Sequence, residues 1–163
     1  RVRSSAASDV YKRQVMSGYP RFPLFIDLTG QKVVLVGGGK VALRRVRTLQ
    51  QCGADVVVIA PTLHPDMPTV THISRPYRPG DLEGATLAVA ATDCSKTNGQ
   101  VAQEARDRGI PISVADDPAA CTFFFPALCV GEGVVAGVVG DGTDHAKTAR
   151  CARQMRELLE DSI

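Results

Sequence analysis

The chain has 163 residues, with 19 Lys and Arg against 17 Asp and Glu, and 44% of its residues are hydrophobic. This length fits one domain with at most a short appendage and excludes a multidomain enzyme. The composition excludes a disordered or collagen-like chain. The longest apolar runs are four to seven residues, whereas a membrane-spanning helix needs about 20, so we expect a soluble protein without a membrane segment.

The first 15 residues differ from the rest in charge. They carry a net charge of +3, which leaves −1 for residues 16–163. Because phosphate binding needs a basic folded surface, the sequence predicts no nucleic-acid partner. Residues 1–15 have neither a hydrophobic period nor the apolar core of a signal peptide. We interpret them as a non-native or disordered leader, with Met16 as the natural start and the cytoplasm as the location.

The chain has five cysteines, an odd number, and none of them shows the C-x-x-C spacing of zinc sites. A disulfide framework is therefore not expected, and the sequence predicts no metal centre. Free cysteines often act as small apolar packing residues in reduced proteins. We expect that role for Cys52, Cys94, Cys121, Cys129 and Cys151.

The first regular elements form a βαβ unit. A β-branched run at 32–36 stops at three glycines, a helical period follows over 41–51, and a second apolar run covers 55–60 after Gly53. Such a crossover predicts parallel pairing of the two strands. The later elements are expected as strands at 72–74, 86–91 and 112–115, a helix at 95–108 capped by Ser95 or Asp93, two hairpin strands at 123–130 and 134–139, and a helix at 144–160.

This order predicts an α/β fold: a Rossmann-like, doubly wound parallel sheet, then a β-hairpin extension and a C-terminal helix. The sheet and hairpin would occupy residues 16–140. Residues 141–163 would begin a helical dimerisation or substrate region that is truncated at Ile163 or present in a minimal form. In a doubly wound sheet, the ligand binds in a crevice at the carboxyl ends of the strands.

The glycine turn fits the dinucleotide-binding pattern G-x-G-x-x-G/A, since it follows a strand and opens a helix. Gly37 would permit the tight turn, Gly39 would let a pyrophosphate approach the backbone, and Ala42 would keep helix and strand close. The alternative is a glycine turn without a ligand. The second strand ends at Ile59-Ala60-Pro61-Thr62, without the usual acidic residue or an Arg. The residues alone therefore do not choose between NAD and NADP.

Several linked motifs carry a family resemblance. They are Tyr19-Pro20, Phe25-Ile26-Asp27-Leu28, Val33 to Arg45, Gly53-Ala54-Asp55, Val58 to Pro61, Ala90-Ala91-Thr92-Asp93 with Asn98, and Val114 to Phe125 with Pro126-Ala127. With these motifs, the chain from about residue 19 to 160 resembles the precorrin-2 dehydrogenase domain of siroheme synthase. The resemblance implies NAD as cofactor and oxidation of precorrin-2, a polycarboxylate tetrapyrrole, to sirohydrochlorin, sometimes coupled to ferrochelation. It also implies a homodimer.

The resemblance places the site residues by position. The residues that would line the dinucleotide are Lys40 and Val41 in the turn, Pro61 and Thr62 after the second strand, and Ala91, Thr92 and Asp93 near the nicotinamide. Asp116 falls at the family's catalytic aspartate. Its chemistry fits independently, because removing a hydride from a reduced tetrapyrrole requires a group that takes the accompanying proton. The alternative is that Asp116 and Asp117 are only a turn pair before Pro118.

The segment after the last strand departs from the family, which usually has I-S-T-G-G-K-S-P there. This chain has Val139 to Ala146, with two aspartates, and it lacks both hydroxyls and one glycine of that loop. Aspartates would repel the substrate's carboxylates. Asp141, Asp144 and His145 could form a metal-handling patch, but a helix N-cap with solvated neighbours is the stronger interpretation. The departure motivates a second hypothesis, a non-catalytic dinucleotide-binding module or degenerate paralogue.

The final helix carries Arg150, Arg153 and Arg156 at a spacing of three residues. Arg150 and Arg153 are candidates for binding substrate carboxylates, and a solvated face is the equal alternative. The opposite apolar stripe, which must pack against something, consists of Ala149, Ala152, Met155 and Leu159. His64 and His72 lie in a proline-rich stretch and are expected at the surface.

Overall fold

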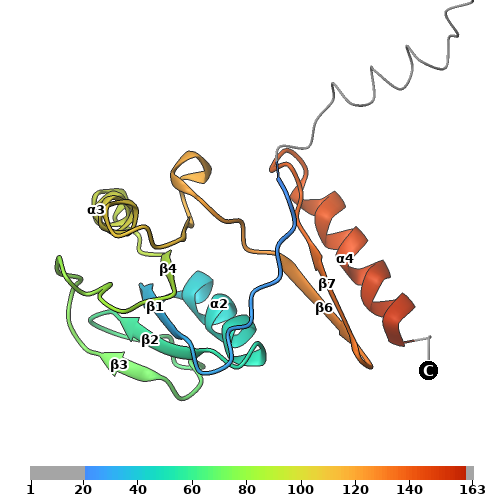
Figure 1. The fold of residues 1–163 in the computed structure, drawn as a ribbon, viewed down its shortest axis with the longest axis horizontal. Helices are drawn as coiled ribbons and strands as arrows, with labels where there is room; N and C mark the ends of the chain where they lie inside the picture. The colour runs from blue at the N-terminus through green and yellow to red at the C-terminus, as the bar shows by residue number, and fades with distance from the viewer. Residues whose placement is uncertain (1–20, 161–163) are drawn as a thin grey trace, which may run out of the picture.

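A computed structural model describes residues 21–160, and Figure 1 shows their fold. The predicted leader, residues 1–15, lies outside the described residues. Five parallel strands form one sheet in the order β3-β2-β1-β4-β5, which confirms the Rossmann-like prediction. Its elements are β1 (Lys32–Val36), α2 (Lys40–Gln51), β2 (Asp55–Ile59), β3 (Thr71–Ile73), β4 (Leu87–Ala90), α3 (Ser95–Asp107) and β5 (Ile112–Val114).

The central strand β1 is apolar on both faces because a helix covers each face. Its last four residues are at most 1% exposed, as expected for a parallel strand between two helical layers. Successive side chains of a strand point to opposite faces, so β1 contributes to two cores. One contains Val33 and Leu35 with Ala42, Val46 and Leu49 of α2, and the other contains Val34 and Val36 with Val101, Ala102 and Ala105 of α3.

The strand order reverses beside β1. From β1 the chain proceeds outward to β2 and β3, then crosses back to β4 and continues to β5 on the other side. Val36 at the end of β1 pairs in register with Ile59 of β2 and Ala90 of β4. The segments that follow these strands therefore meet at one edge of the sheet. This is the point at which doubly wound sheets bind their ligands.

A β-hairpin and a helix extend from the parallel sheet, as predicted. β6 (Ala127–Gly131) pairs antiparallel with β7 (Val134–Val138), and α4 (His145–Glu160) packs against this pair. In Figure 1 the hairpin lies between α4 and the parallel sheet. Gly133, with φ +70°, supplies the left-handed residue of the hairpin turn.

The prediction that the first hairpin strand begins at Phe123 is wrong, since β6 begins at Ala127. The preceding residues form a connection in which Phe123 and Phe125 pack against the core on the α2 side. Their ring centroids are 5.9 Å apart. Pro126 has no N–H to donate to a strand partner. The alternating aromatic residues therefore anchor a loop to the sheet.

The cysteine prediction is correct for the buried and half-buried thiols and wrong for two others. Cys129 is fully buried, and its Sγ lies 3.3 Å from the Ala152 carbonyl oxygen of α4. Cys52 and Cys121 are half-buried. Cys94 and Cys151 are exposed, because the former precedes the first turn of α3 and the latter lies on the outer side of α4. The described residues contain no helix long and apolar enough to cross a membrane.

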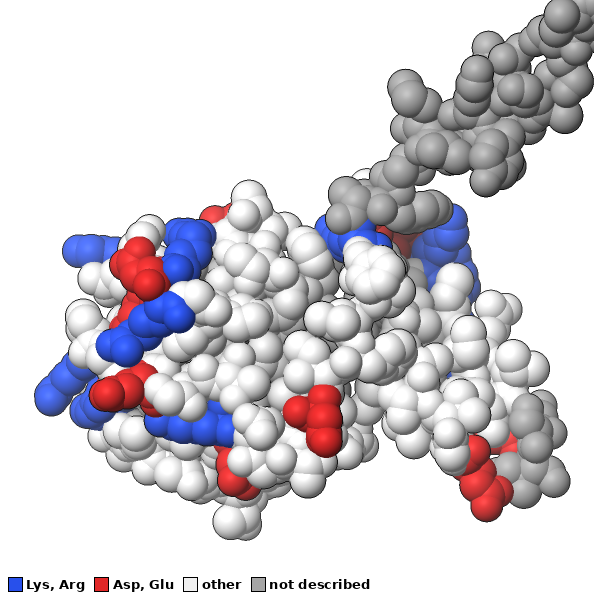
Figure 2. All heavy atoms as spheres, in the orientation of Figure 1, with Lys and Arg blue, Asp and Glu red and all other residues white. Residues whose placement is uncertain are grey.

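Charged side chains gather at the end of the molecule that carries α3 and β3. In Figure 2, Lys and Arg are mixed there with Asp and Glu, whereas the visible surface of the hairpin region is mainly uncharged. Such mixing gives the visible face no continuous basic surface of the kind that nucleic acids require.

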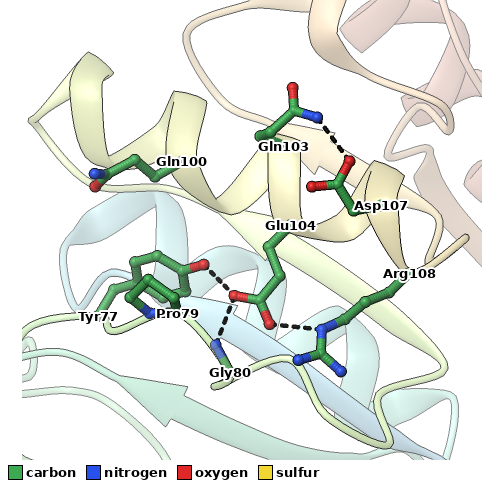
Figure 3. A pocket seen from close by; sticks show the side chains of 8 residues that line it. All are labelled: Tyr77, Pro79, Gly80, Gln100, Gln103, Glu104, Asp107 and Arg108. Atoms are coloured by element: carbon green, nitrogen blue, oxygen red, sulfur yellow. Dashed lines mark hydrogen bonds and ion pairs between the residues drawn. The ribbon is translucent and has the colours of Figure 1, made fainter.

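A pocket of about 520 Å³ lies between the second half of α3 and the segment that follows β3. Figure 3 shows its lining, which includes Tyr77, Gln100 and Glu104. Because α3 starts at the carboxyl edge of the sheet and runs back along it, this pocket lies away from the edge at which the strands end. It is therefore separate from the dinucleotide crevice described below.

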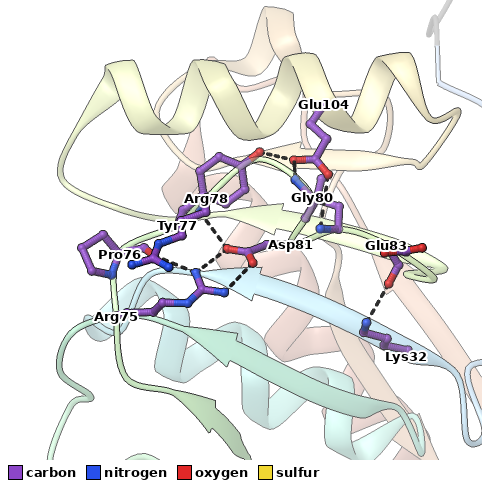
Figure 4. A network of polar contacts seen from close by, with 10 residues as sticks. Lys32, Arg75, Pro76, Tyr77, Arg78, Gly80, Asp81, Glu83 and Glu104 are labelled. Atoms are coloured by element: carbon purple, nitrogen blue, oxygen red, sulfur yellow. Dashed lines mark hydrogen bonds and ion pairs between the residues drawn. The ribbon is translucent and has the colours of Figure 1, made fainter.

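Glu104 of α3 holds the segment between β3 and β4 against the helix. Figure 4 shows its carboxylate accepting hydrogen bonds from the Tyr77 hydroxyl and from the Gly80 N–H, the latter at 3.0 Å. The Arg108 guanidinium pairs with the other oxygen at 2.8 Å. In the same network, Arg75 and Asp81 form a two-bond ion pair at 2.6 and 2.8 Å. Burial raises the pKa of Glu104, but the hydrogen bonds from Tyr77 and the backbone outweigh it and hold this pKa below its ordinary value.

We expect Glu104→Gln to lower the free energy of unfolding by about 1–2 kcal/mol at pH 7, because charge-assisted hydrogen bonds are replaced by neutral ones. A lowered folded-state pKa stabilises the fold above the unfolded-state pKa, and this contribution is lost as pH falls through the folded-state value. The difference between parent and variant should therefore shrink in acid. Urea unfolding from pH 7 to pH 3 measures it, and a difference that stays constant would contradict the assignment.

Candidate functional site

The glycine turn fits tightly between the ends of two neighbouring strands. Gly37 has φ +126°, and a Cβ added to it would lie 2.2 Å from the carbonyl oxygen of Ala91, just after β4. A Cβ on Gly38 would lie 2.0 Å from the carbonyl oxygen of Thr62, just after β2. The His64 N–H donates to the Gly38 carbonyl at 2.7 Å. These two glycines are therefore required by packing, whether or not a ligand binds.

Gly39 differs from its neighbours because its open side faces no protein atom. A Cβ added there would meet nothing within 4 Å. Gly39 is the N-cap of α2, and no side chain caps this helix or places an acidic group in its first turn. Free N–H groups and the positive end of the helix dipole are the features that bind phosphate groups. The turn thus fits the pyrophosphate of a dinucleotide.

The other predicted cofactor residues surround this turn. Lys40 and Val41 are exposed in the first turn of α2, and Pro61 and Thr62 are exposed after β2. After β4, Ala91 is buried, Thr92 is half-buried and Asp93 is exposed. The close approach of Gly37 to Ala91 and of Gly38 to Thr62 brings these three segments together. Their proposed contacts with a cofactor remain predictions.

Asp116 lies two residues after β5 and is hydrogen-bonded by α3. Its Oδ2 accepts from the Ser95 hydroxyl at 2.6 Å, and its Oδ1 accepts from the Asn98 Nδ2 at 2.8 Å. The hydrogen bond from Ser95 is the main cause that lowers the pKa of Asp116. Burial raises this pKa, and the hydrogen bond from Asn98 lowers it further. The carboxylate is exposed and ionised at neutral pH, so it can accept a proton.

Sequence reasoning did not find this arrangement of Ser95 and Asn98. Ser95 or Asp93 was expected to cap α3, but the N-cap is Cys94 and no side chain caps the helix. The Ser95 hydroxyl is instead directed to Asp116. Asn98 is 1% exposed and lies on the apolar face of α3 with Val101. A polar residue in such a stripe was a detectable signal, although its partners were not.

Asp117 acts as the turn residue that the sequence allowed. Its Oδ1 accepts from the N–H groups of Ala119 and Ala120 at 3.0 and 3.3 Å. These residues belong to η1 (Pro118–Ala120), a short 3₁₀ helix with Asp117 as its N-cap. The two neighbouring aspartates therefore make different contacts, and only Asp116 binds α3.

The segment before α4 forms local caps. Asp144 Oδ1 accepts from the Lys147 N–H at 2.7 Å, which is an N-terminal cap. Asp141 Oδ1 accepts from the N–H and hydroxyl of Thr143 at 2.9 and 2.7 Å. In residues 21–160, no three His, Cys, Asp or Glu side chains are placed to hold a metal ion. The contacts of Asp141 and Asp144 therefore favour a helix N-cap with solvated neighbours over a metal-handling patch with His145.

The three arginines of α4 do not behave alike. Arg156 donates two hydrogen bonds to the Leu128 carbonyl of β6, at 3.0 and 3.2 Å. Arg150 and Arg153 are exposed. The helix that carries them, α4, packs against β6 and β7, and Figure 1 shows the hairpin between α4 and the parallel sheet. Binding of substrate by Arg150 and Arg153 remains a prediction.

Comparisons with known proteins show the family and the fold of this chain. A family model described as "Putative NAD(P)-binding" matches residues 24–127. The chain is 40% identical over 147 residues to the "Probable multifunctional siroheme biosynthesis protein HemA" of Ruminiclostridium josui, covering 86% of this chain and 28% of that protein. It is 35% identical to the siroheme synthase of Methylobacillus flagellatus, with 86% and 31% covered. The chain therefore spans about three tenths of the length of these curated relatives.

The fold is also that of a solved structure. "SirC, precorrin-2 dehydrogenase" superimposes with a TM-score of 0.70 and 23% sequence identity, over 87% of this chain and 73% of that one. The match includes the parallel sheet with its helices and the added hairpin and C-terminal helix. The glycine turn lies inside the segment matched by the family model. The chain belongs to the NAD(P)-binding family that this model describes.

Proposed function

We propose that this protein is an NAD-dependent dehydrogenase that oxidises precorrin-2 to sirohydrochlorin in siroheme biosynthesis. The observation that carries the proposal is the position of the Asp116 carboxylate, two residues beyond β5, at the sheet edge that also holds the glycine turn. A proton acceptor and a dinucleotide-binding turn are the two parts that such an oxidation requires. The relatives named for siroheme biosynthesis support the substrate class.

The reaction removes two electrons and two protons from the substrate, as one hydride and one proton. Bound NAD supplies the hydride acceptor. The free N–H groups at the start of α2 would hold its pyrophosphate, and Ala91, Thr92 and Asp93 would lie near the nicotinamide. Asp116 would accept the proton, and its hydrogen bonds with Ser95 and Asn98 would keep the carboxylate ionised and oriented.

The choice of NAD over NADP follows from the family resemblance. The segment from Ala60 to Asp66 after β2 contains neither Lys nor Arg, but the Arg47 guanidinium of α2 donates to the Asp66 carbonyl at 3.3 Å. This segment therefore does not by itself discriminate between the two cofactors. The similarity to a precorrin-2 dehydrogenase supports NAD.

The direct test is to incubate the purified protein with precorrin-2 and NAD⁺ and to follow the sirohydrochlorin spectrum. Formation of sirohydrochlorin and NADH in equal amounts would support the dehydrogenase. Binding of NAD without turnover would support the second hypothesis, a non-catalytic dinucleotide-binding module. Adding Fe²⁺ to the same assay would test ferrochelation, which is a separate activity from the proposed dehydrogenation.

We also propose that the protein is a homodimer and that the hairpin contributes to the interface. Val130, Val134 and Val135 are at least half exposed, and Figure 2 shows few charges on the visible part of this region. Burial of apolar side chains in a partner would remove them from water. The cytoplasmic location and the role of residues 141–163 in dimerisation stay predictions from the sequence.

We expect Val135→Asp to convert the dimer to a monomer, because an unpaired carboxylate in an apolar interface costs several kcal/mol. Light scattering coupled to size-exclusion chromatography measures the molar mass directly. The control is Glu83→Gln between β3 and β4, which changes a charge at an exposed position outside the hairpin and outside residues 141–163 and should leave the mass unchanged. A parent protein that is monomeric at micromolar concentration would contradict the proposal.

A further inference from the structure

The side chain of Asn98 joins two strand ends of the candidate site. It is 1% exposed, and its Oδ1 accepts from the Thr92 N–H at 3.1 Å and from the Thr92 hydroxyl at 2.7 Å. Its Nδ2 donates to the Thr92 carbonyl at 3.0 Å and to Asp116 Oδ1 at 2.8 Å. Thr92 follows β4 and Asp116 follows β5. One buried amide therefore links the predicted nicotinamide segment to the predicted base.

The orientation of this amide follows from its partners. A backbone N–H can only donate, so the atom that faces the Thr92 N–H must be the amide oxygen. The NH₂ group then lies on the other side, where two acceptors are present: the Thr92 carbonyl and the Asp116 carboxylate. Every hydrogen-bonding position of the Asn98 head group is directed by protein atoms, and a flipped amide would place two donors together.

A purely structural role would require only the contacts with Thr92. These contacts pin the segment after β4 to α3. The fourth contact is different, since Asp116 is exposed and could be solvated by water without it. A hydrogen bond to a charged acceptor from a buried donor fixes the direction of the carboxylate and favours its ionised form.

We infer that Asn98 is a positioning residue, which holds the Asp116 carboxylate in a fixed orientation relative to the cofactor segment at Thr92. The inference rests on the proposed function, because the orientation matters for catalysis only if Asp116 accepts the substrate's proton. Ser95 assists from the same helix by donating to the second carboxylate oxygen. Two donors from α3 thus fix both oxygens of the base.

The charged groups around Asp116 do not supply this effect. Asp117 is turned toward the N–H groups of η1. Asp93 and Lys96, which flank the start of α3, are exposed. The causes that lower the pKa of Asp116 through side chains are the hydrogen bonds of Ser95 and Asn98. Replacing the amide of Asn98 by a carboxylate of the same shape therefore tests the contact directly.

The experiment compares Asn98→Asp, Ser95→Ala and the parent protein by NMR titration of ¹³C-labelled aspartate carboxyls, with the Asp116 signal assigned from Asp116→Asn. Two carboxyls in contact titrate as a coupled pair with two separated steps, so in Asn98→Asp the Asp116 signal should report both steps, the upper one about one pH unit or more above the parent titration. Ser95→Ala should shift it upward by a smaller amount. The acid limb of kcat/KM for precorrin-2 should move upward in the same order.

Gln100→Glu is the matched control, because it makes the same amide-to-carboxylate change two residues further along α3, at an exposed position on another face of the helix. Its Asp116 titration should stay at the parent value. Asn98→Asp with an unchanged Asp116 titration would overturn the inference, even in an active enzyme. If Asn98→Asp does not fold, Asn98→Ala replaces it: this variant removes the Nδ2 donor, and an unchanged Asp116 titration in it would overturn the inference. The Asp116 titration could shift in Asn98→Asp although the parent protein has no dehydrogenase activity. That result would support the contact and contradict only the proposed function.

Discussion

Replacing Asp116 by Asn is expected to lower the rate of sirohydrochlorin formation by roughly 10² or more, the usual effect of losing a general base. The substitution keeps the local structure. The Asn oxygen can still accept from the Asn98 Nδ2, and the Ser95 hydroxyl can rotate to accept from the new NH₂ group. NAD affinity should change less than about twofold, since Asp116 follows β5 and the pyrophosphate would bind at the end of β1. Initial rates and calorimetric titration with NAD measure the two quantities.

The neighbouring Asp117→Asn is the control for this prediction. An Asn can cap η1 through its own oxygen, as Asp117 does with Ala119 and Ala120. This variant should retain most of the activity. A native rate in Asp116→Asn would show that the proton goes elsewhere, to Asp141 or to water. Loss of NAD binding in both variants would show that the aspartate pair holds the loop together, and the catalytic role would then be wrong.

The second large effect is expected at Gly39. Gly39→Val should raise the Kd for NAD by on the order of 10², about 2.8 kcal/mol, because a branched side chain would fill the space in which the pyrophosphate meets the start of α2. The fold should persist, since a Cβ at this position meets no protein atom within 4 Å. Its backbone is extended, at φ −84° and ψ −166°, which a Val adopts without strain. Calorimetric titration with NAD measures the affinity, and thermal unfolding checks the fold.

Gly37→Ala gives the opposite combination and serves as the comparison. An added Cβ there would lie 2.2 Å from the Ala91 carbonyl oxygen at a φ of +126°. We expect a loss of at least about 2 kcal/mol in the free energy of unfolding, from the clash and the strained backbone. Undiminished NAD affinity in Gly39→Val would show that the turn does not hold the pyrophosphate. Equal destabilisation in both variants would show that the turn is closed on all sides.

The amino-acid sequence by itself determined the parallel sheet and the location of the crevice. Unbroken apolar runs such as Val33–Val36 are stable only when both faces are covered, and the helical period after the glycines provides one cover. Once the crossovers are predicted, the carboxyl ends of the strands must share an edge. The grouping of Gly37, Thr62 and Ala91 at that edge follows from topology, so local patterns were sufficient to predict it.

Only the tertiary structure decided which polar groups meet. Asn98 and Asp116 are 18 residues apart in the chain, and their 2.8 Å contact depends on how α3 packs over β5. Arg153 and Arg156 are alike in the pattern of α4, yet only Arg156 reaches a carbonyl of β6. Periodicity identifies the face on which a side chain lies. The partner of a hydrogen bond depends on side-chain direction and on the packing of distant elements, which no local pattern encodes.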